Sequence, residues 1–289
     1  MLKTRIVGVV VVKGGIAVQS IGFHRYLPLG RPSIAIEYLN RWGIDEVILL
    51  DIDATWESRP PDLRMMQECA SRGQMPLAAG GGIRSLSDIS GALLAGADKV
   101  VVNTAASEDS SLISEGAGYF GSQCIIVSID AQKLSDGSYE AFTRGGSRPT
   151  GSSPAELAIE AETRGAGEVF LNSIDRDGSC QGYDLDLIRS VVDAVTIPVI
   201  ACGGAGHPDH LREAMALGVS GVAAANFFHY SEHSVIVAKS YLKSRAQNIR
   251  LDSYVTYGFH TIGDDGRIRK GDDGMLQKLR FVDLPEEVI

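Results

Sequence analysis

Glu46-Val-Ile-Leu-Leu-Asp-Ile-Asp53 is an apolar run framed by acids, and it returns later in the chain as Glu168-Val-Phe-Leu-Asn-Ser-Ile-Asp175. The same spacing separates Pro76 from Pro198, and each proline leads into a short apolar run that ends in glycines. A period of about 120 residues is too long for a solenoid unit. Each copy holds apolar, β-branched runs that alternate with helical segments, a pattern typical of parallel strands with both faces buried. The repeat therefore predicts two similar half-barrels that close as one (β/α)8 barrel.

The rest of the chain continues this alternation. Eight strands are expected, at residues 5–12, 46–51, 76–79, 99–102, 124–129, 168–172, 198–201 and 221–224. Amphipathic helices are expected between them, among others at residues 34–42, 86–94, 154–164, 184–194 and 207–217. The predicted fold class is α/β, with a TIM barrel over residues 1–245 and an extension over residues 246–289. In the extension, residues 254–259 alternate like a strand, and Asp264-Asp-Gly266 is a hairpin turn signal before a return strand at 267–270.

Composition excludes several classes of protein. The chain has 289 residues, and 36 acidic side chains against 27 basic ones give a formal net charge of -9. Since Lys and Arg form no run, a nucleic-acid surface is not expected. The apolar runs are too short for a membrane helix, and the segment after Met1 lacks the pattern of a signal peptide. The four cysteines lie far apart and the histidines show no metal-ligand spacing, so we expect no disulfide framework, no metal site and a cytoplasmic location.

Glycine accounts for 33 residues, and it gathers in two loops at one end of the predicted barrel. Gly80-Gly-Gly82 follows the third strand and Gly203-Gly204 follows the seventh, each just before a helix. Backbone N–H groups exposed by glycines at a helix N-terminus bind anions, and Asn103-Thr104 and Asn226 add side-chain donors in the neighbouring loops. The two loops predict a ligand with a phosphate at each end. The alternative is that these glycines only form tight turns.

The opposite end of the predicted barrel carries charge. Arg5, Glu46, Lys99 and Glu168 each begin a strand, so their inward side chains form a ring of two bases and two acids. Charged groups inside a barrel need partners, and a purely structural ring of ion pairs is one interpretation. A functional gate at this end is the other.

Several motifs are specific enough to indicate a family. They occur in the order Gly80-Gly-Gly-Ile-Arg-Ser85, Val102-Asn-Thr-Ala-Ala106, Phe120-Gly-Ser-Gln-Cys124, Arg148-Pro-Thr-Gly151, Asp175-Arg-Asp-Gly-Ser179 and Gly203-Gly-Ala-Gly206. Over residues 1–245 the chain resembles the cyclase subunit of imidazole glycerol phosphate synthase. A sister isomerase of histidine biosynthesis shares the barrel and the phosphate loops but lacks the segments at 120–124 and 148–151. The resemblance is therefore to the cyclase.

The resemblance implies a reaction and a partner. In the family, ammonia from a separate glutaminase subunit enters the base of the barrel, passes through it and reacts at the mouth with a bisphosphorylated ribulosyl formimino substrate. Proton transfers there are assigned to two aspartates, one closing strand one and one closing strand five, and Asp130 fits the second. Asp177 matches an acid that faces the substrate, and Asp51 is a further catalytic candidate. No cofactor is implied.

The family pattern assigns the remaining site residues by position. It implies phosphate contacts for Gly81, Gly82, Asn103, Thr104, Gly178, Gly203, Gly204, Ala225 and Asn226. The four ring positions serve as a gate at the ammonia entrance. Asp98, beside the ring, matches a position that helps to dock the glutaminase.

The predicted mouth departs from the family at four positions. An alignment without gaps places Val11 where the family has its strand-one acid, and valine can neither accept nor donate a proton. Gln19 replaces a lysine that contacts a phosphate, and Cys202 and Asn226 replace serines. The loss of a cation weakens a charge-assisted contact. A misalignment of strand one is the alternative explanation.

These departures favour a subunit that supplies ammonia. The chain resembles a branch of the family that occurs with glutaminase-like partners and an ATP-dependent sugar amidotransferase, where an acetamido group on a bacterial surface sugar becomes an acetamidino group. The leading hypothesis is an ammonia-supplying subunit of such an assembly. One alternative is an active cyclase of histidine biosynthesis whose acid–base pair uses Asp51 or Asp177. The other is a non-catalytic phosphosugar-binding barrel.

Overall fold

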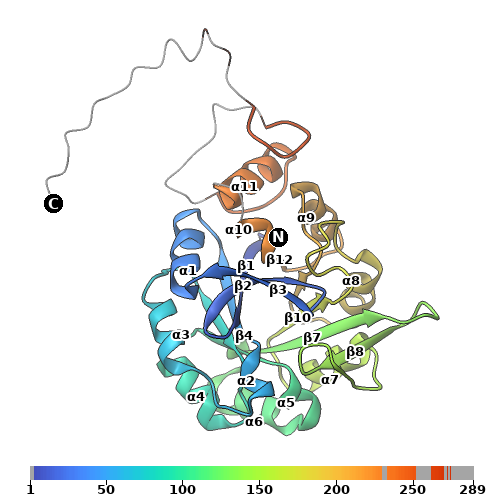
Figure 1. The fold of residues 1–289 in the computed structure, drawn as a ribbon. Helices are drawn as coiled ribbons and strands as arrows, with labels where there is room; N and C mark the ends of the chain where they lie inside the picture. The colour runs from blue at the N-terminus through green and yellow to red at the C-terminus, as the bar shows by residue number, and fades with distance from the viewer. Residues whose placement is uncertain (1–2, 230–232, 252–261, 270–271, 273, 275–289) are drawn as a thin grey trace, which may run out of the picture.

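A computed structural model shows a closed barrel of parallel strands, and it describes residues 3–229, 233–251, 262–269, 272 and 274 (Figure 1). The barrel strands are β1 (Arg5–Lys13), β4 (Glu46–Asp51), β5 (Leu77–Gly80), β6 (Lys99–Val102), β7 (Ile125–Lys133), β10 (Glu168–Ser173), β11 (Val199–Cys202) and β12 (Gly221–Ala224). Each pairs in parallel with the next, and β12 pairs with β1, so the sheet has no open edge. The predicted (β/α)8 TIM barrel is confirmed.

The strand register shows the equivalence of the two halves. Glu46 of β4 lies opposite Val7 of β1, and Glu168 of β10 lies opposite Ile126 of β7. The acids that begin the two copies of the repeat therefore hold the same place in their strand pairs. This register makes position-by-position comparison between the halves meaningful.

Helices cover the outside of the barrel, as the amphipathic segments predict (Figure 1). They are α1 (Pro32–Arg41), α2 (Asp53–Trp56), α3 (Leu63–Ala70), α4 (Leu86–Leu94), α5 (Thr104–Glu108), α6 (Ser111–Phe120), α7 (Pro154–Thr163), α8 (Leu185–Val192), α9 (Pro208–Met215), α10 (Asn226–His229) and α11 (Ser234–Ser244), with a 3-10 turn η1 at Ser122–Cys124. Their starts follow local capping: Ser153 and Glu156 form a capping box at α7. The Ser85 hydroxyl accepts the N–H of Asp88 at the start of α4.

Two hairpins interrupt the βα pattern, and the sequence did not predict them. The strands β2 (Ile16–Ile21) and β3 (Arg25–Gly30) follow β1, and β8 (Tyr139–Thr143) and β9 (Arg148–Pro149) follow β7. Each hairpin thus follows the first strand of a half-barrel. In Figure 1, β2 and β3 cross in front of the barrel opening. The hairpin β2–β3 therefore shapes the mouth.

The core has two layers that follow from the alternation of side chains along each strand. Residues that point outward pack against the helices. Residues that point inward fill the bore with an apolar cluster made of Val7, Val9, Val11, Val18, Ile48, Ala78, Val101, Ile126, Phe170, Ile200 and Ala223. The barrel interior between the base ring and the mouth is thus lined by hydrocarbon.

The described part of the extension is a turn that packs on the barrel. Ile262 and Ile268 form an antiparallel bridge, and the N–H of Gly263 donates to the carbonyl of Arg267 at 2.9 Å. Gly266 has φ +69°, and a Cβ there would lie 2.7 Å from Pro208 Cδ at the start of α9. The turn predicted at 264–266 is therefore present. The strand predicted at 254–259 lies outside the described residues, and of the return strand at 267–270 the described part pairs only through Ile268.

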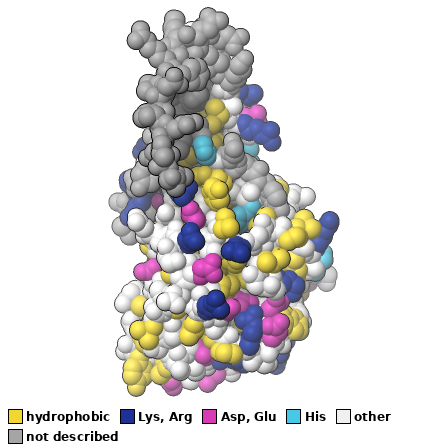
Figure 2. Space-filling view, turned by 60° about the vertical axis from the view of Figure 1, so that its left-hand side comes forward, with side chains coloured by type: hydrophobic (Ala, Val, Ile, Leu, Met, Phe, Trp, Pro, Cys, Tyr) yellow, Lys and Arg dark blue, Asp and Glu magenta, His cyan; other side chains and the backbone are white. Residues whose placement is uncertain are grey.

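The charges on the face of the molecule drawn in Figure 2 are mixed in sign. Figure 2 shows basic and acidic side chains interspersed over the visible face, without a basic patch among the residues that it colours. Within the described residues, no helix combines the length and the apolar character needed to span a bilayer.

Candidate functional site

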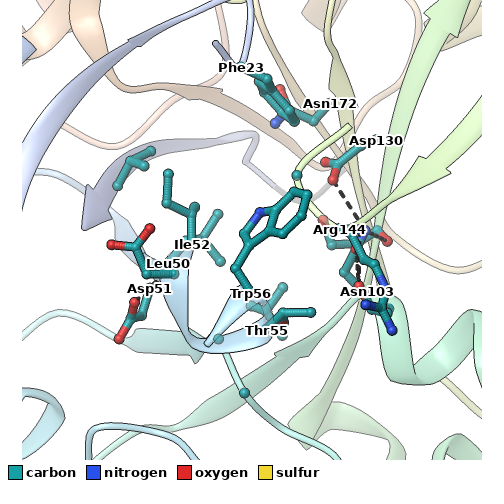
Figure 3. A pocket seen from close by; sticks show the side chains of 18 of the residues that line it. Phe23, Leu50, Asp51, Ile52, Thr55, Trp56, Asn103, Asp130, Arg144 and Asn172 are labelled. Carbon is teal, nitrogen blue, oxygen red and sulfur yellow. Dashed lines mark hydrogen bonds between the residues drawn. The ribbon is translucent and has the colours of Figure 1, made fainter. Parts of the chain in front are cut away.

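A cavity of about 230 Å³ lies at the barrel mouth, at the carboxyl ends of the strands (Figure 3). Both halves contribute to it: Val11 and Leu50 come from the first, and Asp130, Asn172 and Cys202 come from the second. Active sites of TIM barrels lie at this end. The cavity is therefore the candidate site.

Asp130 lies at the centre of the cavity, near the end of β7, and is 8% exposed. Its Oδ2 accepts a hydrogen bond of 3.2 Å from Asn103 Nδ2. Burial raises the pKa of Asp130 to about 7; hydrogen bonds from the amides of Asn172 and Asn103 oppose the rise, and the charge of Asp177 adds to it. A carboxyl group with such a pKa can give or take a proton near neutral pH.

Val11 occupies the position in the first half that Asp130 occupies in the second. Val11 lies opposite Leu50 in the pair of β1 and β4, and Asp130 lies opposite Asn172 in the pair of β7 and β10. Because the two pairs begin in the same register, the comparison needs no sequence alignment. Val11 is 9% exposed and lines the cavity. The mouth thus has a carboxyl group on one side of the twofold repeat and an isopropyl group on the other.

Asp177 also lines the cavity, but hairpin β2–β3 engages it. Its Oδ2 accepts hydrogen bonds from the hydroxyl of Ser20 at 2.6 Å and from the N–H of Phe23 at 3.2 Å. The N–H of Gly22 donates to the Asp177 carbonyl at 3.1 Å. Burial raises the pKa of the Asp177 carboxyl, and these hydrogen bonds oppose the rise. Asp177 therefore anchors the hairpin over the second half of the mouth.

Replacement of Ser20 by alanine is expected to lower the free energy of unfolding by about 1 kcal/mol, because it removes a net intramolecular hydrogen bond. Ser20 is 4% exposed, and its loss leaves Asp177 with fewer donors. Urea unfolding measures the change. The exposed Ser107→Ala on α5 is the control, and equal stabilities of the two variants would show that the anchor contributes nothing.

Asp51 lines the cavity with its carboxylate already paired. Arg59 binds both oxygens: Nη1 lies 2.7 Å from Oδ2, and Nη2 lies 2.8 Å from Oδ1. The N–H of Asp53 donates to Oδ1 at 3.2 Å. Such a bidentate pair fixes the orientation of the carboxylate. Asp51 is thus placed at the mouth as predicted, in an arrangement suited to positioning the loop after β4.

The first glycine loop borders the cavity. Gly81 and Gly82 have φ of +111° and +75°, and a Cβ on Gly81 would lie 2.3 Å from the carbonyl oxygen of Asp51. Both glycines are therefore required by the close approach of the loop after β4. Asn103 and Thr104 border the same part of the cavity. Four of the predicted phosphate contacts are brought together here.

The second glycine loop is placed differently. Gly203 and Gly204 are buried and do not line the cavity, whereas the neighbouring Ala225 does. The side-chain amide of Asn226 donates to the carbonyl of Ser20 at 2.7 Å. Gly178, in the loop after β10, also faces that carbonyl. Gly178 and Asn226 therefore lie against β2, whereas Gly203 and Gly204 pack against Ser173 and Gly182.

A closed ring of ion pairs lies at the base of the barrel, at the four positions predicted. Lys99 Nζ lies 2.8 Å from Glu46 Oε1 and 2.8 Å from Glu168 Oε2. Arg5 Nη1 lies 2.5 Å from Glu46 Oε2, and Arg5 Nη2 also pairs with Glu168. Each charge has two partners of opposite sign. The ring closes the base of the bore, directly below the apolar cluster.

Asp98 is exposed beside this ring, at the start of β6. Its Oδ2 accepts the N–H of Leu77 at 2.8 Å, and its own N–H donates to the Leu77 carbonyl at 2.8 Å. The side chain is thus held at the rim of the base. A partner that docked on the base would contact the Asp98 side chain in this orientation.

Metal and thiol chemistry find little support in the described residues. No group of three or more potential His, Cys, Asp or Glu ligands occurs among them. Cys202 lines the cavity, and burial raises the pKa of its thiol far above the usual range. A protonated thiol is a poor nucleophile and a poor ligand. Cys180 is exposed and does not line the cavity.

Several cavity residues were not predicted from the sequence, among them Trp56, Arg144 and Asn172. Figure 3 shows the indole of Trp56 projecting into the cavity between Ile52 and Asp130. Trp56 comes shortly after the repeated run at residues 46–53. Its place in the loop that follows a strand was the sequence signal that could have identified it. Arg144 lies on the unpredicted hairpin β8–β9, which left it without a sequence signal. Asn172 aligns with the inward position of Leu50 in the repeat.

Comparisons with known proteins agree with the resemblance drawn from the motifs. Residues 5–234 match the protein family described as "Histidine biosynthesis protein". A protein of Vibrio vulnificus (strain YJ016), described as "Putative imidazole glycerol phosphate synthase subunit hisF2", is 43% identical over 258 residues. The match covers 89% of this chain and 94% of that protein.

Proposed function

We propose that this chain, which belongs to the histidine biosynthesis protein family and is of the cyclase-subunit type of imidazole glycerol phosphate synthase, supplies ammonia to a second enzyme without cyclising a substrate itself. Subunits of this type pair with a glutaminase. The ammonia of that partner is proposed to enter at the base and leave at the mouth. The acceptor is proposed to be a sugar bound to an ATP-dependent amidotransferase, which converts an acetamido to an acetamidino group on a bacterial surface sugar in the cytoplasm.

The base and the bore support the ammonia route. The ring of Arg5, Glu46, Lys99 and Glu168 has no uncompensated charge, so one ion pair can open while each charge keeps another partner. Above it, the inward side chains are apolar. A hydrocarbon lining admits neutral ammonia and opposes ammonium, since a charge without a partner is costly there. Asp98 offers a charged contact at the rim for the glutaminase.

The proposed loss of cyclisation rests on the presence of Val11. The family reaction uses two acids, and Val11 holds the register position in β1 that Asp130 holds in β7, which supports its equivalence to the first acid. Asp130 remains as a single acid–base group, and it has no carboxyl partner across the twofold repeat. One group can accept a proton or donate one, but it cannot do both at two atoms in the same step.

The experiment is a survey of partners in the native host. The full chain is tagged and purified, and the proteins that accompany it are identified by mass spectrometry. A glutaminase together with an ATP-using sugar amidotransferase is expected. A matched Asp98→Lys variant is expected to lose the glutaminase. Recovery of the glutaminase alone, together with rescue of a histidine auxotroph that lacks its cyclase, would contradict the proposal.

Replacement of Val11 by aspartate is expected not to create cyclase activity. The variant restores the second carboxyl but keeps Gln19, Cys202 and Asn226 at the other three positions where the mouth departs from the family. The side-chain amide of Asn226 also stays bound to Ser20. Formation of imidazole glycerol phosphate by the V11D variant, assayed with ammonium salts, measures the outcome, and V11N is the control of equal size. Activity above the V11N control would show that only one residue separates this chain from a cyclase.

The competing function is an active cyclase that pairs Asp130 with Asp177. Both carboxyl groups line the cavity. Burial raises the pKa of each, and the charge of Asp177 adds to the rise at Asp130. Growth of the histidine auxotroph on the wild-type chain, and its loss in an Asp177→Asn variant, would favour this function. No growth with the wild-type chain is expected.

A further inference from the structure

The loop of Arg144, Gly145 and Gly146, between β8 and β9, lies where several parts of the mouth meet. We call it the Arg144 loop, and its first two residues line the cavity. A Cβ on Gly145 would lie 3.4 Å from Trp56 Nε1, and a Cβ on Gly146 would lie 3.2 Å from Phe23 Cδ2. Because the two glycines carry no side chains, both rings rest against the backbone of the loop. The packing of the mouth therefore reaches the Arg144 loop.

The backbone of this loop is in an uncommon conformation. Arg144 has φ +51°, and Gly145 and Gly146 follow with φ of +59° and +78°. The left-handed region suits glycine, but it is uncommon for a residue with a Cβ. A residue in such a conformation is held there by its surroundings. The shape of the loop therefore depends on the contacts of Arg144.

Those contacts tie Arg144 to both ends of α5. Its N–H donates to the hydroxyl of Thr104 at 3.2 Å, at the first residue of the helix. Its Nη2 lies 3.2 Å from Glu108 Oε1, at the last residue, and Arg148 Nη1 lies 3.0 Å from the same oxygen. The Nε of Arg144 is buried and has no hydrogen-bond partner in the described structure. Two contacts with α5 thus hold the loop, and the one with Thr104 leads toward the cavity.

Thr104 continues a chain of hydrogen bonds to Asp130. Its hydroxyl donates to Asn103 Oδ1 at 3.2 Å. The Nδ2 of Asn103 donates to Asp130 Oδ2 at 3.2 Å and to the carbonyl of Ser128 at 3.0 Å. Since an amide presents an acceptor at one end and a donor at the other, Thr104 fixes which end faces Asp130. Figure 3 shows Asp130, Asn103 and Arg144 together on one side of the cavity.

The orientation of Asn103 matters because Asp130 is buried. A hydrogen bond from the Asn103 amide favours the charged carboxylate and opposes the rise in the pKa of Asp130 that burial causes. Without this donor, the carboxyl would hold its proton more tightly. The other titratable groups that interact with Asp130 are Asp177, Tyr26 and Cys202, and all of them stay unchanged in the variants below.

We propose that Arg144 and Thr104 are positioning residues that act on Asp130. The Arg144 loop holds Thr104, Thr104 holds Asn103, and the amide of Asn103 keeps the acid able to release its proton. The loop thereby transmits the packing of the mouth to Asp130. This inference rests on the proposed function, in which Asp130 is the single acid–base group of the mouth, and it adds a means by which the surroundings of the mouth regulate that group.

The proton affinity of Asp130 is the direct readout. The full chain is labelled with ¹³C at its aspartate carboxyl groups, and the Asp130 signal, identified by its absence in Asp130→Asn, is followed by NMR across neutral pH. Thr104→Val keeps the size of the side chain and removes the hydroxyl. Proton binding by Asp130 is expected to tighten by about threefold to tenfold, the effect of one weakened hydrogen bond. Thr104→Ser keeps the hydroxyl and is expected to titrate as the wild type does.

A double variant tests whether Arg144 acts along the same chain. Arg144→Ala removes the pair with Glu108 and leaves a residue with a Cβ at φ +51°, so the loop is expected to leave Thr104 and proton binding by Asp130 to tighten. Addition of Thr104→Val is expected to cause no further change, because both substitutions break one chain. An effect of the lost cation through space would add to that of Thr104→Val. Arg84→Ala, which removes another cation at the cavity, is expected to leave the titration unchanged.

Gly146→Ala tests the link between the mouth and the loop. The new methyl would stand 3.2 Å from the Phe23 ring at φ +78°, so ring and loop are forced apart and proton binding by Asp130 is expected to tighten. Gly137→Ala is the matched control in the same hairpin, because its φ is +88° and its Cβ would meet nothing within 4 Å. Equal titrations of these two variants would overturn the link.

Two further results would overturn the inference: a folded Thr104→Val protein whose Asp130 titrates as in the wild type, and additive effects of Thr104→Val and Arg144→Ala. Near-ultraviolet circular dichroism checks the fold of each variant. Thr104→Ala, measured in parallel, is expected to shift the titration in the same direction as Thr104→Val. No glutaminase, ammonia or acceptor is present, so these results do not bear on the ammonia route, and the partner survey does not bear on them.

Discussion

Replacement of Asp130 by asparagine is expected to make the protein more stable than the wild type at pH 8, by about 3 kcal/mol more than at pH 5. The cause is the burial of Asp130, which raises the pKa of its carboxyl to about 7 in the folded state. An asparagine keeps the size of the side chain. Its oxygen can still accept from Asn103, and its amide can donate toward Asn172 Oδ1, which has no partner in the described structure.

The direction follows from proton binding. Between the unfolded pKa near 4 and the folded pKa of about 7, the folded wild type holds a proton on Asp130 that the unfolded chain has released. Stability therefore falls as pH rises through this window, by about 1.4 kcal/mol per unit, and is level above and below it. The variant lacks the group and so lacks this fall. Urea unfolding at a series of pH values from 5 to 8 measures the difference.

Asp136 provides a control of opposite sign. It lies exposed in the turn after β7, and hydrogen bonds from Ser138 lower the pKa of its carboxyl. This group stabilises the folded state above its unfolded pKa, and the contribution is lost as pH falls. Because both its folded and unfolded pKa values lie near or below 4, an Asp136→Asn variant should differ from the wild type by a constant amount from pH 5 to 8 and lose that difference only in more acid solution, whereas Asp130→Asn gains stability as pH rises from 5 to 8. Parallel pH profiles for Asp130→Asn and the wild type would show that Asp130 is charged in the folded protein.

The barrel could be predicted from the sequence because its signal is repeated. The acid-framed runs at Glu46 and Glu168 mark the same place in both halves, and the strands that they begin match the observed bounds at their first residues. The hairpins after β1 and β7 escaped prediction. Residues 16–21 are too short to declare a strand by alternation, and β9 has only 2 residues. The preceding barrel strand fixes their pairing. This is a tertiary effect, and the local sequence pattern does not encode it.

The same hairpins explain what was missed at the mouth. The position of Val11 could be predicted from the sequence because β1 is a barrel strand, and the strand register supports that placement. The contact of β2 with Asn226 could not be predicted, because it joins Ser20 to a residue 206 positions further along the chain. Symmetric loops predicted symmetric phosphate contacts. A hairpin follows the first barrel strand in both halves, but β2 of the first hairpin contacts Asn226 and Gly178 of the second half, and this contact removes the symmetry.

Replacement of Lys239 by methionine is expected to lower the free energy of unfolding by about 3–5 kcal/mol, because it leaves a buried charge without its partner. The Lys239 side chain on α11 is 1% exposed, and its Nζ lies 2.6 Å from Asp45 Oδ1 and 2.5 Å from the carbonyl of Gly43. The other oxygen of Asp45 accepts the N–H of Ile6 at 2.7 Å. The pair therefore joins α11 to the starts of β1 and β4.

A double variant separates the lost pair from a lost side chain. Lys239→Met with Asp45→Asn removes both charges, while an asparagine oxygen still accepts from Ile6, so most of the lost stability should return. Lys243→Met, exposed on the same helix, should change stability by less than about 0.5 kcal/mol. Ile6 and Asp45 adjoin Arg5 and Glu46 of the base ring. If the double variant stays as unstable as the single one, the lost stability comes from the packing of α11 and not from the charge of Asp45. The ion pair would then make no contribution to the base ring.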